Sequence, residues 1–177
     1  MPTSSRTFDD GEISTVTIHP YDRSLPFSNY IAVGFYESNI VRVMHTAELM
    51  RPFLPSISLP HLPVSLLLCQ FGLGSTGRRR SNGHSKNHPS HILVGLGDGT
   101  LHVYGVDVVD GVANVGEQRV IPLGSTKPVF MTPVGPLQST SDNELCVLAS
   151  GSRPVVLYWD SGRLKHSPLV RKVSATK

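Results

Sequence analysis

Short alternations of apolar and polar residues recur along the 177-residue chain, and no segment keeps the 3.6-residue period of an amphipathic helix. The runs are rich in β-branched and aromatic residues and are separated by clusters of Gly, Pro, Asn, Asp and Ser. The pattern predicts strands at Ile13–Ile18, Tyr30–Phe35, Ile40–His45, Val64–Phe71, His91–Leu96, Thr100–Val106, Arg119–Leu123, Val129–Val134, Glu144–Ala149 and Val155–Asp160. We therefore expect an all-β fold.

The stretch HILVGLGDGTLHVYGVD contains three glycines at alternate positions, Gly95, Gly97 and Gly99. A dinucleotide-binding loop needs G-x-G-x-x-G at the start of a helix, but Thr100 stands where the last glycine is required. The residues that follow alternate like a strand, and Asp98-Gly99 is a preferred pair for a two-residue hairpin turn with positive φ at both positions. The glycines are therefore interpreted as turn residues, not as a phosphate site.

Two other segments resemble this hairpin. Val94-Gly95-Leu96 can be placed without a gap over Val33-Gly34-Phe35, and also over Leu148-Ala149-Ser150, which is followed by Arg153 and Pro154. Each copy reads as strand, small residue, polar turn and strand. When much of the stretch 72–89 is set aside, the spacing approaches the ~40–50 residues of a four-stranded propeller blade.

Three such hairpins predict about three four-stranded blades, each hairpin supplying the two middle strands. A closed propeller needs ~4–8 blades, so this number is too small for a ring. The chain is therefore expected to be part of a larger propeller, with a β-sandwich of about ten strands as the alternative.

Composition narrows the class of protein. Hydrophobic residues make up 39% and charged residues 16%, with 16 Gly and 14 Pro, which suits many short strands. The net charge of +3 is too small to indicate nucleic-acid binding by itself. Cys69 and Cys146 lie inside apolar runs, as reduced intracellular cysteines do. No apolar run is long enough to span a membrane, and residues 1–10 contain no secretory apolar region and are expected to be disordered.

The segment 72–89 is predicted to be an inserted loop, because Gly, Ser and Asn dominate it and cannot build a core. It carries Arg78, Arg79, Arg80 and Lys86, which could serve nuclear import or contact phosphate groups. It lacks the aromatic residues that stack on single-stranded bases, so nucleic acid is expected to bind only weakly or indirectly.

Candidate chemistry is sparse. His84, His88 and His91 have the spacing H-x3-H-x2-H, but Asn87 and Pro89 disfavour the helix that would let the first two share a metal. No G-x-S-x-G nucleophile elbow and no convergent acid–base cluster is found. We expect no cofactor, no metal and no catalysis. Two classes remain, a protein-interaction scaffold and a small all-β enzyme or carbohydrate-binding domain, and the lack of a polar cluster favours the scaffold.

The ordered segments EISTVTIHP, IAVGFYESNIVRV, LPVSLLLCQF, HILVGLGDGTLHVYGVD and SGSRPVVLYWDSGRL, with Leu123-Gly124 and Pro128 between the last two, resemble the large subunits of UV-damaged-DNA-binding proteins. Those subunits are the propeller adaptors of cullin-4 ubiquitin ligases. The same superfamily includes scaffolds of RNA cleavage, polyadenylation and splicing. The resemblance covers 11–171 and leaves 172–177 as a tail.

The resemblance implies a chain of three propellers, with this stretch in the second. That propeller docks the cullin, and the others hold substrate receptors. Tyr36 stands where the family commonly has tryptophan, and with Glu37 it marks a turn that could face a partner. A role in ubiquitination and DNA repair, in the nucleus and cytoplasm, follows as the expectation, with RNA processing as the alternative.

Overall fold

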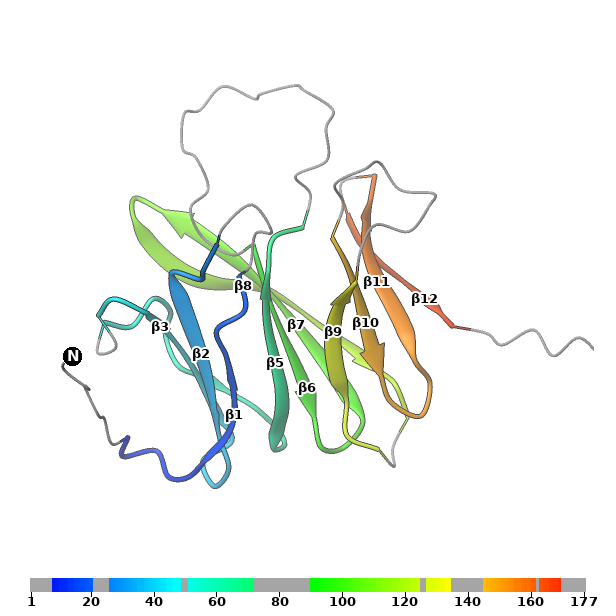
Figure 1. Cartoon of the computed structure of the whole chain (residues 1–177), viewed down its shortest axis with the longest axis horizontal. Helices are drawn as coiled ribbons and strands as arrows, with labels where there is room; N and C mark the ends of the chain where they lie inside the picture. The colour runs from blue at the N-terminus through cyan, green and yellow to red at the C-terminus, as the bar shows by residue number, and fades with distance from the viewer. Residues whose placement is uncertain are drawn as a thin grey trace, which may run out of the picture.

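The computed structural model describes residues 8–20, 26–48, 51–71, 90–124, 127–134, 145–161 and 163–169. These residues form three four-stranded antiparallel sheets arranged side by side (Figure 1). Their strands are β1 (Ile13–Thr17), β2 (Tyr30–Phe35), β3 (Ile40–His45), β4 (Ile57–Ser58), β5 (Pro63–Cys69), β6 (His91–Leu96), β7 (Thr100–Val109), β8 (Val112–Pro122), β9 (Phe130–Val134), β10 (Cys146–Ser150), β11 (Val155–Asp160) and β12 (Arg163–Pro168).

Each sheet is a simple meander in which neighbouring strands follow one another along the chain. The glycine-marked hairpins β2–β3 and β6–β7, and the third copy β10–β11, are the middle strands of three separate sheets, as predicted. The first strands of the sheets are neighbours, because β5 contacts both β1 and β9. This arrangement confirms the partial propeller and excludes one sandwich built from the three hairpins.

Two apolar core layers fill the spaces between neighbouring sheets, and a smaller buried cluster that includes Val33 and Phe35 lies on the outer face of the first sheet. The layer between the first and second sheets includes Val41, Val43, Leu66, Leu68 and Val94. The layer between the second and third sheets includes Leu93, Leu101, Val147, Ala149 and Leu157. The second sheet is therefore buried on both faces, whereas the first and third sheets each pack on one described neighbour.

Most strands lie where the alternation predicts them, and β2, β3, β6 and β11 have the predicted bounds. The pattern missed β4, β12 and the first half of β8. The β7–β8 hairpin is a long ribbon whose Ala113 packs in the first core layer, next to Leu54. Its outer residues Val108, Val109 and Val112 are exposed.

The turn predicted at Asp98-Gly99 is wrong in type. Gly99 has a φ of +88°, but Asp98 does not adopt positive φ, and the loop joining β6 to β7 has three residues, 97–99. Asp98 Oδ1 accepts hydrogen bonds from the Thr100 backbone N–H (3.0 Å) and hydroxyl (2.7 Å), which stabilises this longer loop. The two-residue turn with both φ values positive occurs at Asp110-Gly111, between β7 and β8.

The repeat register also needs two corrections. Gly34 pairs with Val41 whereas Gly95 pairs with Leu101, so the first hairpin loop is one residue longer than the second. In the third copy Ala149, which the alignment places over Gly95, packs against the preceding sheet, whereas Gly95 lies against Val129 at the start of the following sheet. The side-chain period of two makes such a one-residue error exchange the two faces of the sheet.

Candidate interaction surfaces

The hairpin turns that sequence singled out lie at one end of the molecule, where backbone hydrogen bonds join them to the connections between sheets (Figure 1). The Gly99 carbonyl accepts a hydrogen bond from Leu123 N–H (2.9 Å), and in the preceding sheet the Asn39 carbonyl accepts one from Leu59 N–H (2.9 Å). Asn39, with a φ of +52°, thus takes the role of Gly99. A Cβ on Gly99 would collide with the Gly124 carbonyl. The Leu123-Gly124 pair therefore belongs to a junction between sheets.

Two strand glycines permit close contact between the first strands of neighbouring sheets. A Cβ on Gly34 would lie 2.9 Å from side-chain carbons of both Pro63 and Thr15. A Cβ on Gly95 would collide with the Val129 carbonyl, to which the Ser65 hydroxyl donates a 2.6 Å hydrogen bond. Both glycines are therefore needed by the packing of sheets, as small residues.

The remaining predicted turn residues are spread over the same end. Arg153 N–H donates to the Leu123 carbonyl (2.7 Å) and Pro154 is half-buried beside it. Gly97 N–H donates to the Leu62 carbonyl (3.0 Å). These two backbone bonds join the β10–β11 and β6–β7 loops to the connections that precede their sheets.

The Tyr36-Glu37 turn lies at the end of the first sheet, and both side chains are exposed. Tyr36 N–H donates to the Glu12 carbonyl (2.7 Å), which fixes the turn against the start of β1. A rigid turn that presents an aromatic and an acidic side chain is suited to contact with a protein partner. The role of this turn remains a prediction.

The free face of the first sheet is apolar. Val16 and Ile18 are 49% and 62% exposed, whereas Leu66 and Leu68, which take the same positions on β5, are 7% and 1% exposed. The equivalence follows from the pairings of Val16 with Val33 and of Leu66 with Val94, after the same irregularity near the start of each strand. Leu66 and Leu68 are buried by a preceding sheet, which β1 does not have among the described residues.

Part of this face is covered by the segment that precedes β1. The Phe8 ring packs edge-on against Phe35, with 5.3 Å between centroids, and the Asp10 carboxylate pairs with the Arg42 guanidinium at 2.7 Å. On the opposite flank, the free face of the third sheet exposes Phe130. Both ends of the array therefore present apolar side chains to solvent.

A cavity of about 730 Å³, open to solvent, lies between the second and third sheets. One wall is an aromatic cluster in which His91 meets Phe71 and Trp159 edge-on, at centroid distances of 5.4 and 5.8 Å. Ser90 Oγ lies 2.9 Å from His91 Nδ1 and accepts a hydrogen bond from Phe71 N–H. The cluster joins residues from β5, β6 and β11 regions that are far apart in sequence.

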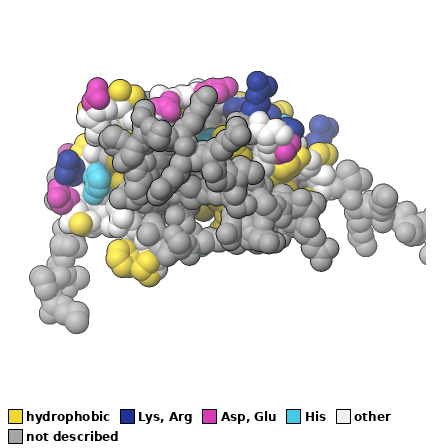
Figure 2. Space-filling view, turned by 90° about the horizontal axis from the view of Figure 1, so that it is seen from above, with side chains coloured by type: hydrophobic (Ala, Val, Ile, Leu, Met, Phe, Trp, Pro, Cys, Tyr) yellow, Lys and Arg dark blue, Asp and Glu magenta, His cyan; other side chains and the backbone are white. Residues whose placement is uncertain are grey.

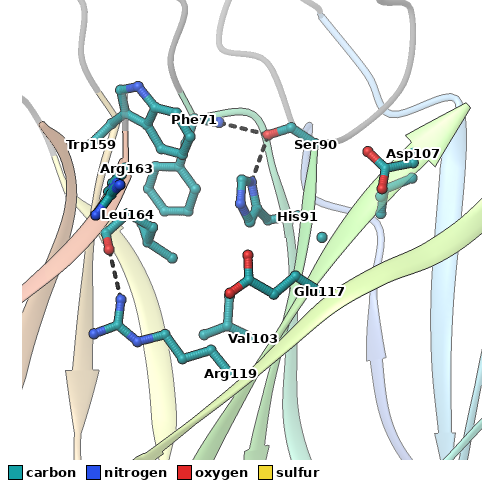
Figure 3. A pocket seen from close by; sticks show the side chains of 12 residues that line it. Phe71, Ser90, His91, Val103, Asp107, Glu117, Arg119, Trp159, Arg163 and Leu164 are labelled. Carbon is teal, nitrogen blue, oxygen red and sulfur yellow. Dashed lines mark hydrogen bonds between the residues drawn. The ribbon is translucent and has the colours of Figure 1, made fainter. Parts of the chain in front are cut away.

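Charged side chains from three strands complete the cavity. Asp107 and Glu117 come from β7 and β8, where a bulge near Gly105 interrupts the pairing. Arg119 of β8 reaches toward β12, which supplies Arg163. Figure 3 shows the Glu117 carboxylate directed into the centre, below His91, with Asp107 on the side away from Trp159. Viewed from this end, the molecule has acidic and basic side chains along one edge (Figure 2).

Arg119 spans the outer end of this cavity. Its guanidinium donates to the Leu164 carbonyl (2.7 Å) and lies 3.2 Å from His166 Nδ1. A guanidinium can only donate, so this second contact requires an unprotonated Nδ1. Burial and the Arg119 charge both lower the pKa of His166. The outermost strands of the second and third sheets are thus linked by one side chain.

A buried histidine lies in the other core layer. His102 is 4% exposed, and its Nδ1 lies 3.2 Å from the Tyr104 hydroxyl and 3.1 Å from Gln118 Nε2. Burial lowers the pKa of His102, an effect that the Asp98 charge opposes. Burial also raises the pKa of the Cys69 thiol. Both residues act as packing groups of the core.

Several predicted residues cannot be placed. Arg78, Arg79, Arg80, Lys86, His84 and His88 lie outside the described residues. Within the described ranges no group of three or more His, Cys, Asp or Glu side chains could hold a metal ion. Over the same ranges, no helix is long and apolar enough to cross a membrane.

Comparison with known proteins identifies the family. Residues 2–177 match the family described as RSE1/DDB1/CPSF1 second beta-propeller. The chain belongs to this family. It is 26% identical over 157 residues to DNA damage-binding protein 1a of Arabidopsis thaliana, and 25% identical over 159 residues to DNA damage-binding protein 1 of Solanum lycopersicum. These matches cover 88% and 89% of this chain but only 12% of each relative, so the chain spans about an eighth of their length.

The family match agrees with the three sheets and with the resemblance read from the turn motifs. The chain is thus a propeller segment of the RSE1/DDB1/CPSF1 family, whose structural role is that of a scaffold. Sequence reasoning found the turns of this scaffold and missed the cavity. The cavity residues come from distant strands, and none of them forms a local motif.

Proposed function

We propose that this chain is a non-catalytic protein-interaction scaffold that works as part of a second propeller, in an adaptor for cullin-RING ubiquitin ligases linked to DNA repair. The observation that carries the proposal is the exposure of Val16 and Ile18, where the equivalent Leu66 and Leu68 are buried. An apolar sheet face of this kind stabilises a propeller only when another blade covers it. The family match and the damage-binding relatives support the same role.

The cullin role is tested by placing residues 11–171 in the corresponding position of the Arabidopsis relative and measuring cullin-4 binding with purified proteins. We expect a monodisperse particle that retains the cullin. The variant Tyr36→Ala with Glu37→Ala should weaken cullin binding while keeping the same unfolding midpoint. A matched variant, Glu48→Ala with Arg51→Ala, removes an exposed ion pair elsewhere and should bind normally. A folded chimera that fails to bind cullin-4 would refute the ligase role.

The second candidate is a scaffold of RNA processing, which the RSE1 and CPSF1 members of the same family favour. The chimera distinguishes the two, because an RNA-processing scaffold has no need for a cullin-binding turn. Substrate receptors are further expected partners of a ligase adaptor. The Arg78–Arg80 run and Lys86 are proposed to direct part of the protein to the nucleus, and a fluorescent fusion with these residues changed to alanine should move toward the cytoplasm.

A further inference from the structure

The cavity between the second and third sheets has the size and shape of a binding site. Its volume of about 730 Å³ lies within the roughly 300–1,000 Å³ of ligand pockets. It needs no additional blade for its walls, because both sheets that form it are described. Its chemistry can therefore be examined independently of how the propeller is completed.

Two carboxylates from the second sheet line this cavity. Neither Asp107 nor Glu117 has a hydrogen bond or ion pair with any side chain in the described part of the structure. The β-bulge between Tyr104 and Val106 shifts the pairing of β7 with β8 at this point. Bulges commonly redirect side chains at binding sites, and here Glu117 points into the cavity (Figure 3).

The basic residues of the cavity do not neutralise these carboxylates. Arg119 is directed toward β12, where it donates to the Leu164 carbonyl and contacts His166. Arg163 lies on the same side as Leu164, and neither arginine comes within 4 Å of a described carboxylate. The cavity therefore has an acidic end near Glu117 and a separate basic end near β12.

The aromatic wall adds a second recognition element. Phe71 and Trp159 both line the cavity, and each makes a T-shaped contact with His91. An arginine side chain has an apolar stem that packs on such rings and a planar guanidinium that stacks on aromatic faces and pairs with carboxylates. Val103 and Leu164 supply further apolar lining for the stem.

We propose that this cavity binds an arginine side chain from a partner protein, with its guanidinium at Glu117 and Asp107 and its stem between Phe71 and Trp159. The inference deepens the proposed scaffold function, on which it rests, by naming the chemistry of a partner residue. The contact would join the partner to the second and third sheets at once.

Trp159 is the only tryptophan of the chain, so its fluorescence reports this cavity directly. We would titrate the full 177-residue chain with N-acetyl-arginine amide, and in parallel with N-acetyl-citrulline amide, which has nearly the same shape without the charge. We expect a saturable change in Trp159 emission with the arginine probe and at least tenfold weaker binding of citrulline. The double variant Glu117→Gln with Asp107→Asn should weaken binding of the arginine probe by at least tenfold.

The matched control is Glu12→Gln with Glu48→Gln, which removes the same charge from exposed sites outside the cavity and should leave binding unchanged. Because neither Asp107 nor Glu117 has a side-chain partner among the described residues, circular dichroism of the double variant should match the parent. Glu117→Gln alone gives a second measurement. Equal binding of both probes, or no effect of Glu117→Gln, would overturn the proposal. So would stronger binding of N-acetyl-glutamate amide that is lost in Arg163→Gln. The probe titration involves no cullin, so its outcome is separate from the test of the ligase role.

Discussion

Truncating equivalent side chains in successive sheets tests whether the first sheet is built to be covered by another blade. The pair is Leu68→Ala and Ile18→Ala, because Ile18 follows Val16 by two residues just as Leu68 follows Leu66. Leu68 is 1% exposed and lies in the core layer between the first two sheets, whereas Ile18 is 62% exposed. The two substitutions remove similar side-chain volumes from positions that differ strongly in burial.

The expected costs follow from these exposed fractions. Truncation of a buried leucine lowers the free energy of unfolding by about 2–5 kcal/mol, and Leu68 should cost about 3 kcal/mol. Full burial of an isoleucine contributes about 1.5–3 kcal/mol, so Ile18, which is mostly exposed, should cost less than about 1 kcal/mol. With an m value of about 2 kcal/mol/M in urea, Leu68→Ala should lower the unfolding midpoint by about 1.5 M.

The assay is urea unfolding followed by circular dichroism and by Trp159 fluorescence, on the 177-residue chain and on a longer chain that also carries the preceding blades of the Arabidopsis relative. In the longer chain the cost of Ile18→Ala should rise toward that of Leu68→Ala, because the added blade buries the side chain. If Ile18→Ala costs as much as Leu68→Ala in the short chain, or remains neutral in the long one, the assignment of this face as a blade interface is wrong.

Three further results are expected from the fold. Gly99→Ala should lower the free energy of unfolding by several kcal/mol through positive φ and a collision with a backbone carbonyl, whereas Gly111→Ala, at similar φ but with nothing within 4 Å, should cost about 1 kcal/mol in the same urea assay. Burial lowers the pKa of His102, so the unfolded chain binds the proton at higher pH than the folded chain does, and the free energy of unfolding should fall as the pH drops below about 6.5. This loss of stability should be smaller in His102→Asn. It should persist in His61→Asn, which changes an exposed histidine. Cys69 should resist iodoacetamide in the folded chain, as mass spectrometry would show, and react after unfolding in urea.

The middle strands of each sheet were predictable because the alternation of apolar residues within each strand is enough to identify it. In β6 and β7 apolar side chains alternate between two core layers, and Gly95 and Gly99 stand where packing and φ leave no room for a side chain. The outermost strands gave a weaker signal. Of the residues of β12, only Leu164 is even half-buried, so the segment reads as a polar tail until β11 is beside it.

The turn and register errors have one physical origin, which is that local preference fits more than one place in the chain. The chain contains Asp-Gly at 10–11, 98–99 and 110–111, and of these pairs only Asp110-Gly111 forms the two-residue turn with both φ values positive. At Gly99 the loop is instead fixed by the hydrogen bond to Leu123 and by the nearby Gly124 carbonyl. Contacts between residues that are far apart in sequence decide such cases, and no alternation pattern contains them.

The cavity is formed by features of the outer strands that the sequence pattern did not predict. Tight packing of two sheets would close the space between them, and it does so around Leu93 and Leu157, where both sheets present apolar residues. Toward the outer strands the inner faces become polar, the bulge near Gly105 turns Glu117 inward, and Arg119 rather than an apolar contact joins β8 to β12. The propeller segment thus has an apolar interface where the two sheets pack closely and an open, charged cavity toward the outer strands. If the arginine probe binds there, the polar outer strands that read as a tail in the sequence are the recognition surface of the scaffold.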